Sequence, residues 1–311
     1  VGTAPDGIRV FCPDALPGET LEVEETVRKK QYATARPLRR LHTSPERVTP
    51  PCPVFKACSS PDEAPGCGGC QIQHLSETGQ LAWKRSHIRE SLVRIGHLDP
   101  DLVDRLLGPV HRSADNTAYR AKAQYPAGLS PLTLAFYARS SHELVPHEAC
   151  LIQPEAINRL RGQVEAWLRS EGITPYDETS HRGELRHIVI RLGRATDELM
   201  LILVASDAHR LRQFDWSSLQ STLHIQSIWL NLNTHSGNRI LGRDWQHLAG
   251  SEVIHETIGD LTFAISPGAF FQVNPLETHT LYDTILRFSQ VQPDDVVYDL
   301  YCGSGTISAC L

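Results

Sequence analysis

Four of the eight cysteines lie within one short stretch of the chain. Cys52, Cys58, Cys67 and Cys70 fall within a segment rich in proline, glycine and serine, whereas the rest of the eight cysteines are scattered. Thiolates grouped in this way suit tetrahedral zinc or a [4Fe–4S] cluster, and their spacing does not separate the two. The first residues lack the basic start and apolar run of a secretory signal, so the clustering favours a metal centre over disulfides.

A second constellation lies near residue 311. The apolar run 296–300 contains Asp299 and is followed by Gly303-Ser304-Gly305. A glycine turn between a buried strand and a helix holds nucleotide-like cofactors, because glycine lets the backbone approach the ligand closely. Asp299 favours S-adenosylmethionine, whose amino acid portion is cationic. An NAD-dependent oxidoreductase with a metal centre is the alternative that these residues leave open.

The charge balance gives no overall attraction for nucleic acid. The chain has 30 basic and 36 acidic residues, a formal net charge of −6, so RNA contact would need local patches. One basic run comprises Arg28, Lys29, Lys30, Arg36, Arg39 and Arg40, although such a run is more often a solvated face. No apolar stretch has the length of a membrane span, and we expect a cytoplasmic protein that is a monomer.

The hydrophobic pattern changes along the chain. Residues 1–46 alternate in short runs between turns, which predicts a small β-barrel. A helix with Leu81, Ile88, Leu92 and Ile95 on one face should end near Gly96. Further on, we expect a helix over 155–169 and strands over 132–137, 187–192, 198–205 and 225–232. The middle of the chain therefore reads as an α+β domain on an antiparallel sheet.

The last sixty residues should begin a Rossmann-like unit. Residues 252–256 and 261–265 read as a hairpin, and Asn274-Pro275 supplies an N-cap followed by proline at the first helical position. That helix should bury Leu281, Ile285 and Phe288. Residues 296–300 read as a buried parallel strand.

Several ordered motifs resemble those of the RNA uracil-C5 methyltransferases, and most closely the 23S rRNA 5-methyluridine branch. The matching strings are Pro51-Cys52-Pro53-Val54-Phe55, Cys67-Gly68-Gly69-Cys70-Gln71-Ile72-Gln73-His74-Leu75, Tyr119-Arg120-Ala121-Lys122, Cys150-Leu151-Ile152-Gln153, Ser266-Pro267-Gly268-Ala269-Phe270-Phe271-Gln272-Val273-Asn274-Pro275 and Asp299-Leu300-Tyr301-Cys302-Gly303-Ser304-Gly305-Thr306. The resemblance runs through essentially the whole chain.

The resemblance implies a multi-domain α/β protein. Residues 1–46 would be a TRAM domain, an OB-like RNA-binding barrel that lacks its first strand. Residues 47–79 and 112–262 would form a central domain with an iron–sulfur cluster. Residues 80–111 and 263–311 would be part of a class I, S-adenosylmethionine-dependent methyltransferase domain.

The resemblance also assigns residues. The cluster ligands would be Cys52, Cys67, Cys70 and Cys150, with Cys58 as the alternative to Cys52 because an insertion places it at the usual spacing of a ligand. The cofactor residues would be Gln272, Tyr301, Gly303 and Thr306, besides Asp299. Arg120 and Lys122 would contact RNA.

In this family a cysteine thiolate adds to C6 of uracil, C5 then takes the methyl group, and a carboxylate base removes the C5 proton before elimination. That cysteine and a glutamate base should lie beyond Leu311, so we expect no catalytic residue within this chain, which reads as truncated at its C-terminus. Ribosomal RNA is the expected substrate. Transfer RNA, or a role as an RNA-binding fragment without catalysis, are the alternatives.

Overall fold

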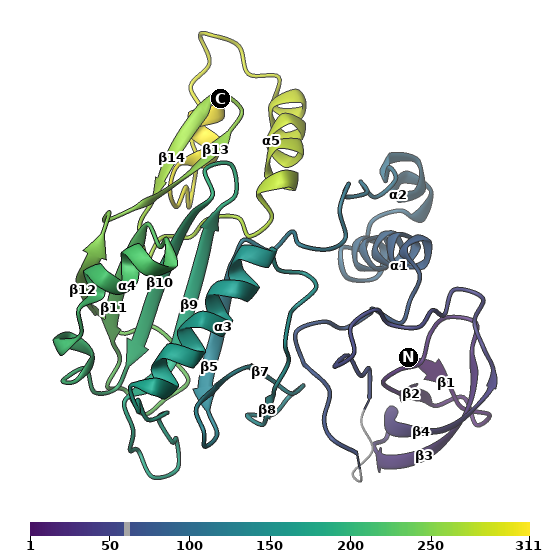
Figure 1. Ribbon diagram of the computed structural model, residues 1–311. Helices are drawn as coiled ribbons and strands as arrows, with labels where there is room; N and C mark the ends of the chain where they lie inside the picture. The colour runs from purple at the N-terminus through teal and green to yellow at the C-terminus, as the bar shows by residue number, and fades with distance from the viewer. Residues whose placement is uncertain (59–62) are drawn as a thin grey trace. The chain divides into compact units, whose positions relative to one another are not determined.

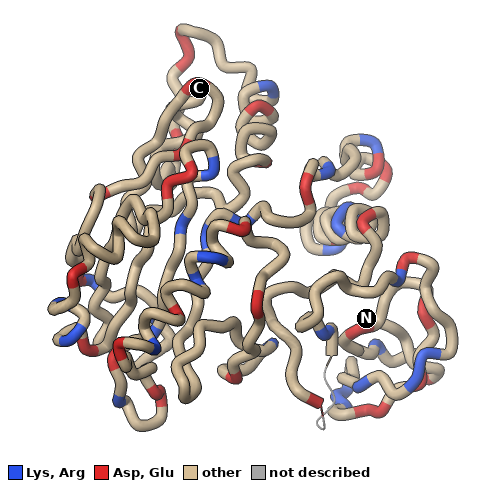
Figure 2. The backbone as a smooth tube through the Cα atoms, in the orientation of Figure 1, with Lys and Arg blue, Asp and Glu red and all other residues tan. Residues whose placement is uncertain are grey.

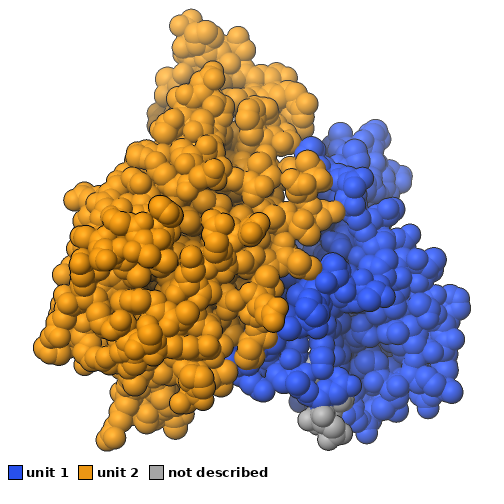
Figure 3. Space-filling view, viewed as in Figure 1, with its two compact units in different colours: residues 1–112, 137–145 blue, residues 113–136, 146–311 orange. Residues whose placement is uncertain are grey.

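The chain divides into two compact units. The computed structural model describes residues 1–58 and 63–311. The first unit holds residues 1–112 and 137–145, and the second holds residues 113–136 and 146–311 (Figure 3). Residues 80–111, which the sequence associates with the methyltransferase part, cluster with the N-terminal unit. No helix in the described ranges is both long and apolar enough to cross a membrane.

A four-stranded sheet begins the first unit. Its strands are β1 (Gly2–Thr3), β2 (Arg9–Phe11), β3 (Thr20–Arg28) and β4 (Tyr32–His42), in the order β1-β2-β4-β3. On β3 and β4, opposite charges meet across the ladder, and Figure 2 shows the blue and red segments side by side there. Arg39 pairs with Glu22 and Arg36 with Glu24, so these cations of the basic run are already neutralised.

Three short helical segments follow in the first unit: α1 (Glu77–Glu90), the π-helical turn η1 (Ser91–Ile95) and α2 (Pro100–Leu106). The Ser76 hydroxyl caps α1 by accepting from the Gly79 N–H at 3.0 Å, and Asp99 caps α2. The predicted end near Gly96 is confirmed. Ile88 and Ile95 on the predicted apolar face are 46% and 79% exposed.

The second unit is built on a six-stranded sheet. Its strands are β5 (Lys122–Gly128), β6 (Thr133–Leu134), β9 (Leu185–Gly193), β10 (Glu198–Ala205), β11 (Ser227–Leu232) and β12 (Asp244–Gly250), in the order β12-β11-β10-β9-β5-β6. β10 and β11 run parallel, so the expected antiparallel sheet is wrong in this respect. Helix α4 (Trp216–Leu223) lies between them in the chain, and this crossover lets two parallel strands pair. A two-stranded sheet of β7 (Phe136–Tyr137) and β8 (Leu144–Val145) lies in the segment 137–145 of the first unit, apart from Phe136.

Both faces of the large sheet are covered (Figure 1). On one face, α3 (Glu155–Ser170) and α4 pack over the main core, and a short 3-10 turn, η2 (Leu211–Gln213), precedes α4. On the other face, the hairpin of β13 (Ile254–Ile258) and β14 (Leu261–Ile265) packs through Ile254 and Ile265 on Met200 and its neighbours. The predicted hairpin and the predicted helix 155–169 are both confirmed.

The last helices are α5 (Pro275–Ser289) and α6 (Thr306–Cys310). Asn274 caps α5 as predicted, but the helix buries Thr278 and Tyr282, while Leu281 and Phe288 are 47% and 75% exposed. The expected buried strand over residues 296–300 is also wrong, since this segment forms no strand and Val296 is 77% exposed. A parallel strand forms only beside a neighbour, and no described strand lies there to pair with it.

Candidate functional site

Three of the motif segments meet within the second unit. The Ala118 and Arg120 N–H groups each donate at 2.8 Å, to the carbonyl oxygens of Leu151 and Ile152. The next residue, Ala121, donates its N–H to the Val273 carbonyl oxygen at 2.7 Å. The chain from 118 to 121 is therefore held between the Cys150 segment and the Gln272 segment. Segments far apart in the sequence are brought together at the start of β5.

The glycine turn lies beside the same place. The Ser304 hydroxyl donates to the Phe270 carbonyl oxygen at 3.1 Å, two residues before Gln272. Thr306 shares a hydrogen bond of 2.6 Å with the Tyr282 hydroxyl on α5, which fixes the first turn of α6. Gly303 and Gly305 both have positive φ, 58° and 68°, which is the backbone geometry that glycine permits without strain.

Two other expected cofactor residues have different surroundings. The Asp299 carboxylate accepts from the Ser308 hydroxyl at 2.5 Å, so it is tied to α6. Tyr301 is fully exposed and has a positive φ of 63°. Its side chain contributes to no core in the part of the chain that the structure describes. The structure thus brings Gln272 and the glycine turn near one another and leaves Tyr301 in solvent.

A small cavity joins the expected cofactor and RNA residues. Lys122 and Gln272 both line it, together with Arg191 on β9 and Glu256 on β13. The space open to the centre of a water-sized molecule is about 20 Å³. Sequence reasoning missed Arg191 and Glu256, although an arginine that interrupts the apolar run of the predicted strand 187–192 was a visible signal.

Both cations of this cavity are removed from water. Burial, then the charges of Arg191 and Arg120, lowers the pKa of Lys122 from 10.5 to about 8. Burial lowers the pKa of Arg191 to about 10. The Arg191 guanidinium donates to the carbonyl oxygens of Ser266 and Ala269, at the two ends of the turn that leads to Gln272. It therefore holds the motif segment 266–272 against the sheet.

The cysteine segment is anchored in the first unit. The Cys67 N–H donates to the Val54 carbonyl oxygen at 2.8 Å, and the Cys67 Sγ accepts from the Gly69 N–H at 3.4 Å. Burial raises the pKa of the Cys67 thiol, and the nearby thiol groups of Cys70 and Cys52 raise it further against the lowering effect of that N–H. The charge of Cys58 contributes to raising the pKa of the Cys12 thiol, after burial.

Cys150 belongs to the second unit, where Asn158 on α3 fixes it. The Cys150 N–H donates to the Asn158 side-chain oxygen at 2.8 Å, and the Asn158 amide donates back to the Cys150 carbonyl at 3.1 Å. Outside residues 59–62, no group of three or more His, Cys, Asp or Glu side chains is arranged to hold a metal ion. The metal centre expected from the cysteines therefore stays a prediction.

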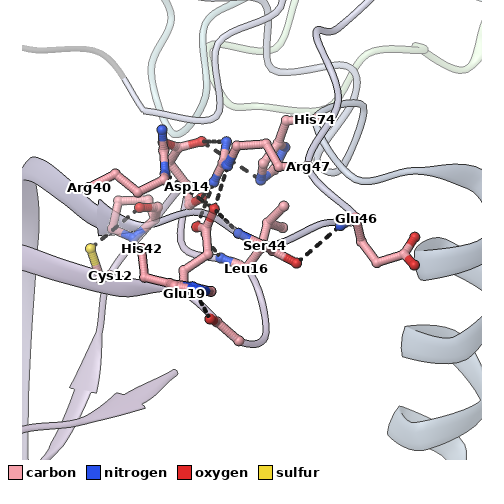
Figure 4. A network of polar contacts seen from close by, with 12 residues as sticks. Cys12, Asp14, Leu16, Glu19, Arg40, His42, Ser44, Glu46, Arg47 and His74 are labelled. Carbon is pink, nitrogen blue, oxygen red and sulfur yellow. Dashed lines mark hydrogen bonds and ion pairs between the residues drawn. The ribbon is translucent and has the colours of Figure 1, made fainter.

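A buried polar network fastens the cysteine segment to the N-terminal sheet (Figure 4). The Arg47 guanidinium donates two hydrogen bonds, of 2.6 and 2.8 Å, to the fully buried Glu19 carboxylate. It also donates to Asp14 at 3.0 Å. His74, four residues after Cys70, lies 3.8 Å from Asp14 and stacks on Phe55. Burial lowers the pKa of His74, so it is neutral at physiological pH and acts as a packing group here.

No protein-family model matches the chain. An uncharacterized RNA methyltransferase of Halalkalibacterium halodurans is 38% identical over 310 residues, which are 98% of this chain and 65% of that protein. One of Clostridium tetani is 34% identical over 321 residues, 100% of this chain and 67% of that protein. The chain belongs to this family of RNA methyltransferases. It spans 65% of the length of the Halalkalibacterium halodurans relative.

The chain also shares its fold with a solved structure. The protein is the Pyrococcus abyssi tRNA (uracil-54, C5)-methyltransferase in complex with S-adenosyl-L-homocysteine, with a TM-score of 0.72 and 22% identity. The match covers 99% of this chain and 68% of that one. At this identity the likeness concerns the mixed α/β fold.

Proposed function

We propose that the chain is part of an enzyme that methylates C5 of uridine in RNA with S-adenosylmethionine. One observation carries the proposal most directly: the segments of Arg120, Cys150 and Gln272 are hydrogen-bonded to one another, and the glycine turn lies against Phe270. These are the segments whose motifs resemble the uracil-C5 methyltransferases. The RNA methyltransferase relatives and the fold of the Pyrococcus abyssi enzyme support the same activity.

The cofactor would supply the methyl group, and the chain's residues would hold it. Gly303 has no side chain and faces open space, so a ligand could approach its backbone. The Thr306 side chain is hydrogen-bonded to Tyr282, and the Asp299 carboxylate accepts from Ser308. Gln272 follows the turn whose carbonyl oxygens accept from Arg191. We propose Gln272, Asp299, Tyr301, Gly303 and Thr306 as the cofactor residues.

We propose that RNA contacts Arg120 and Lys122, which project from the same end of β5, and a TRAM-type barrel formed around β1 to β4. Arg120 is exposed and Lys122 is half-buried beside it. The target base must leave its RNA fold before C5 can be reached, so the contacts around it should act on phosphates and unstacked bases. RNA affinity should therefore fall steeply with salt in spite of the acidic total.

We also propose a [4Fe–4S] cluster on Cys52, Cys67, Cys70 and Cys150. Cys52 is preferred to Cys58 because the Cys-Pro-x-Phe context of Cys52-Pro53-Val54-Phe55 resembles that of the family's first cysteine. Anaerobically purified protein should be brown and contain about four irons per chain. Cys52→Ser should lose iron, whereas Cys58→Ser and the matched control Cys12→Ser should keep it. Stoichiometric zinc without visible absorption would contradict the cluster.

The substrate is best tested by transfer of radiolabelled methyl groups. We propose 23S ribosomal RNA, with transfer RNA as the second candidate because the solved neighbour acts on tRNA. A C-terminally extended protein should label undermodified ribosomal RNA, and label on transfer RNA alone would decide for the second candidate. The 311-residue chain itself should transfer no label, because the resemblance places the nucleophile and base after the glycine turn. Absence of label on any RNA from the extended protein would refute the proposed function.

A further inference from the structure

Two cations that have no acidic partner among the described residues lie side by side in the second unit. Lys122 on β5 and Arg191 on β9 are directly opposite each other in the antiparallel ladder. Side chains of such a pair share one face of the sheet and stand about 5 Å apart at Cβ, where like charges destabilise the pairing. Both line the cavity with Gln272.

Burial makes this arrangement more costly. Arg191 is only 4% exposed, and its Nε has no hydrogen-bond partner among the residues that the structure describes. The charges acting on Lys122 are those of Arg191 and Arg120, with no carboxylate among them in the described ranges. Buried charges in proteins are normally paired or bound to a ligand. The described residues thus place two like charges together at a partly buried position without a carboxylate in an ion pair with either.

The acidic residue of the cavity does not supply such a carboxylate. Glu256 uses its carboxylate to accept backbone N–H groups, from Arg194 at 2.7 Å and from Ala195 and Thr257 at 3.0 Å. These bonds satisfy the carboxylate and fix the turn between β9 and β10. The cation pair is thus left for a group from outside the chain.

We propose that Lys122 and Arg191 form a binding site for a backbone phosphate of the RNA substrate, next to Gln272. This inference rests on the proposed function, which supplies RNA as the ligand. The cavity has room for about one water-sized group, so an anionic oxygen can enter while a base or sugar cannot. A phosphate held there would place the RNA chain beside the segment that we assign to the cofactor.

The test measures binding of a fluorescein-labelled oligouridine to the whole chain by fluorescence anisotropy over a series of KCl concentrations. Lys122→Gln should weaken binding about tenfold at low salt and reduce the salt slope by about 0.7, the value for one phosphate contact on a single strand. Arg159→Gln is the matched control, because α3 carries this exposed arginine on the other face of the sheet. Its affinity and slope should stay unchanged.

A second measurement uses the wild-type chain and so does not depend on the variant folding. Acetic anhydride labelling of Lys122, followed by mass spectrometry, should be slowed by oligouridine and more weakly by inorganic phosphate. Protection by S-adenosylhomocysteine but not by oligouridine would assign the anion to the cofactor carboxylate and overturn the proposal. An unchanged salt slope together with no protection would also overturn it. Neither result would refute the proposed function, which is tested separately by methyl transfer with the extended protein.

Discussion

Substitution of Glu19 tests how much its buried charge contributes to the stability of the first unit. Its carboxylate is fully buried and accepts hydrogen bonds from Arg47 and from the backbone N–H of Leu16 at 3.0 Å and Ser44 at 3.4 Å. Burial alone would raise the pKa of this group, but these donors hold it at about 2, below its usual 4.5. Glu19→Gln removes the charge while it keeps the size of the side chain.

The size of the effect follows from that pKa. A group whose pKa is lowered by folding stabilises the folded state above its unfolded pKa, and this stabilisation is lost as the pH falls through the folded pKa. The fall from 4.5 to about 2 corresponds to about 3 kcal/mol at pH 7. About 2 kcal/mol of this is lost between pH 7 and pH 3. The cost of Glu19→Gln should therefore shrink from about 3 to about 1 kcal/mol over that range.

Hydrogen exchange followed by mass spectrometry suits this test, because it reports each unit of the chain separately. Peptides from β3 and β4 should lose protection in Glu19→Gln, while peptides from β9 and β10 serve as an internal reference. Glu22→Gln is the matched control, since Glu22 pairs with Arg39 at 3.3 Å in solvent and such pairs contribute little. A cost of Glu19→Gln that is the same at pH 7 and pH 3 would refute the role given to its charge.

Three further substitutions test the second unit. Asn158→Ala should destabilise it by about 1–3 kcal/mol in urea unfolding, because the Cys150 N–H loses its acceptor. Asn158→Asp should also destabilise it, because a carboxylate oxygen would face the carbonyl oxygens to which the Asn158 amide now donates. Tyr282→Phe should speed proteolytic cleavage near residue 306 by removing the bond to Thr306, with Tyr298→Phe as an exposed control. Because the pKa of Lys122 is lowered to about 8, wild-type stability should rise between pH 8 and 10.5 more than that of Lys122→Met, as measured by urea unfolding.

Local patterns predicted much of the fold. The spacing of Ile157, Leu160, Val164 and Leu168 placed α3, and Asn274-Pro275 placed the start of α5, because both signals act within a few residues. Strand direction was beyond such signals. The β10–β11 pair is parallel because α4 returns the chain to the same end of the sheet. The residues of the two strands do not by themselves indicate this strand direction.

The candidate site was predicted in part for a similar reason. Motifs named Lys122 and Gln272, but the residue that joins them, Arg191, lies in no motif and matters through the carbonyl groups that it contacts. Glu19 and Arg47 are likewise 28 residues apart and unremarkable in the sequence. Long-range polar contacts depend on strand register and on the course of the loops. The short-range periodicity of a sequence predicts neither of these.

The segment 296–300 marks the limit of reasoning from a local pattern. Its apolar side chains are those of a strand covered on both faces, and the predicted glycine turn follows it, with positive φ at Gly303 and Gly305. Yet Val296, Tyr298 and Leu300 are each more than three-quarters exposed. Hydrophobic side chains specify burial, but burial needs a surface to pack on, and a ladder needs a strand beside it. The described part of the chain offers neither here, and Leu281 and Phe288 of α5 are exposed as well. We therefore predict that this chain is poorly soluble by itself.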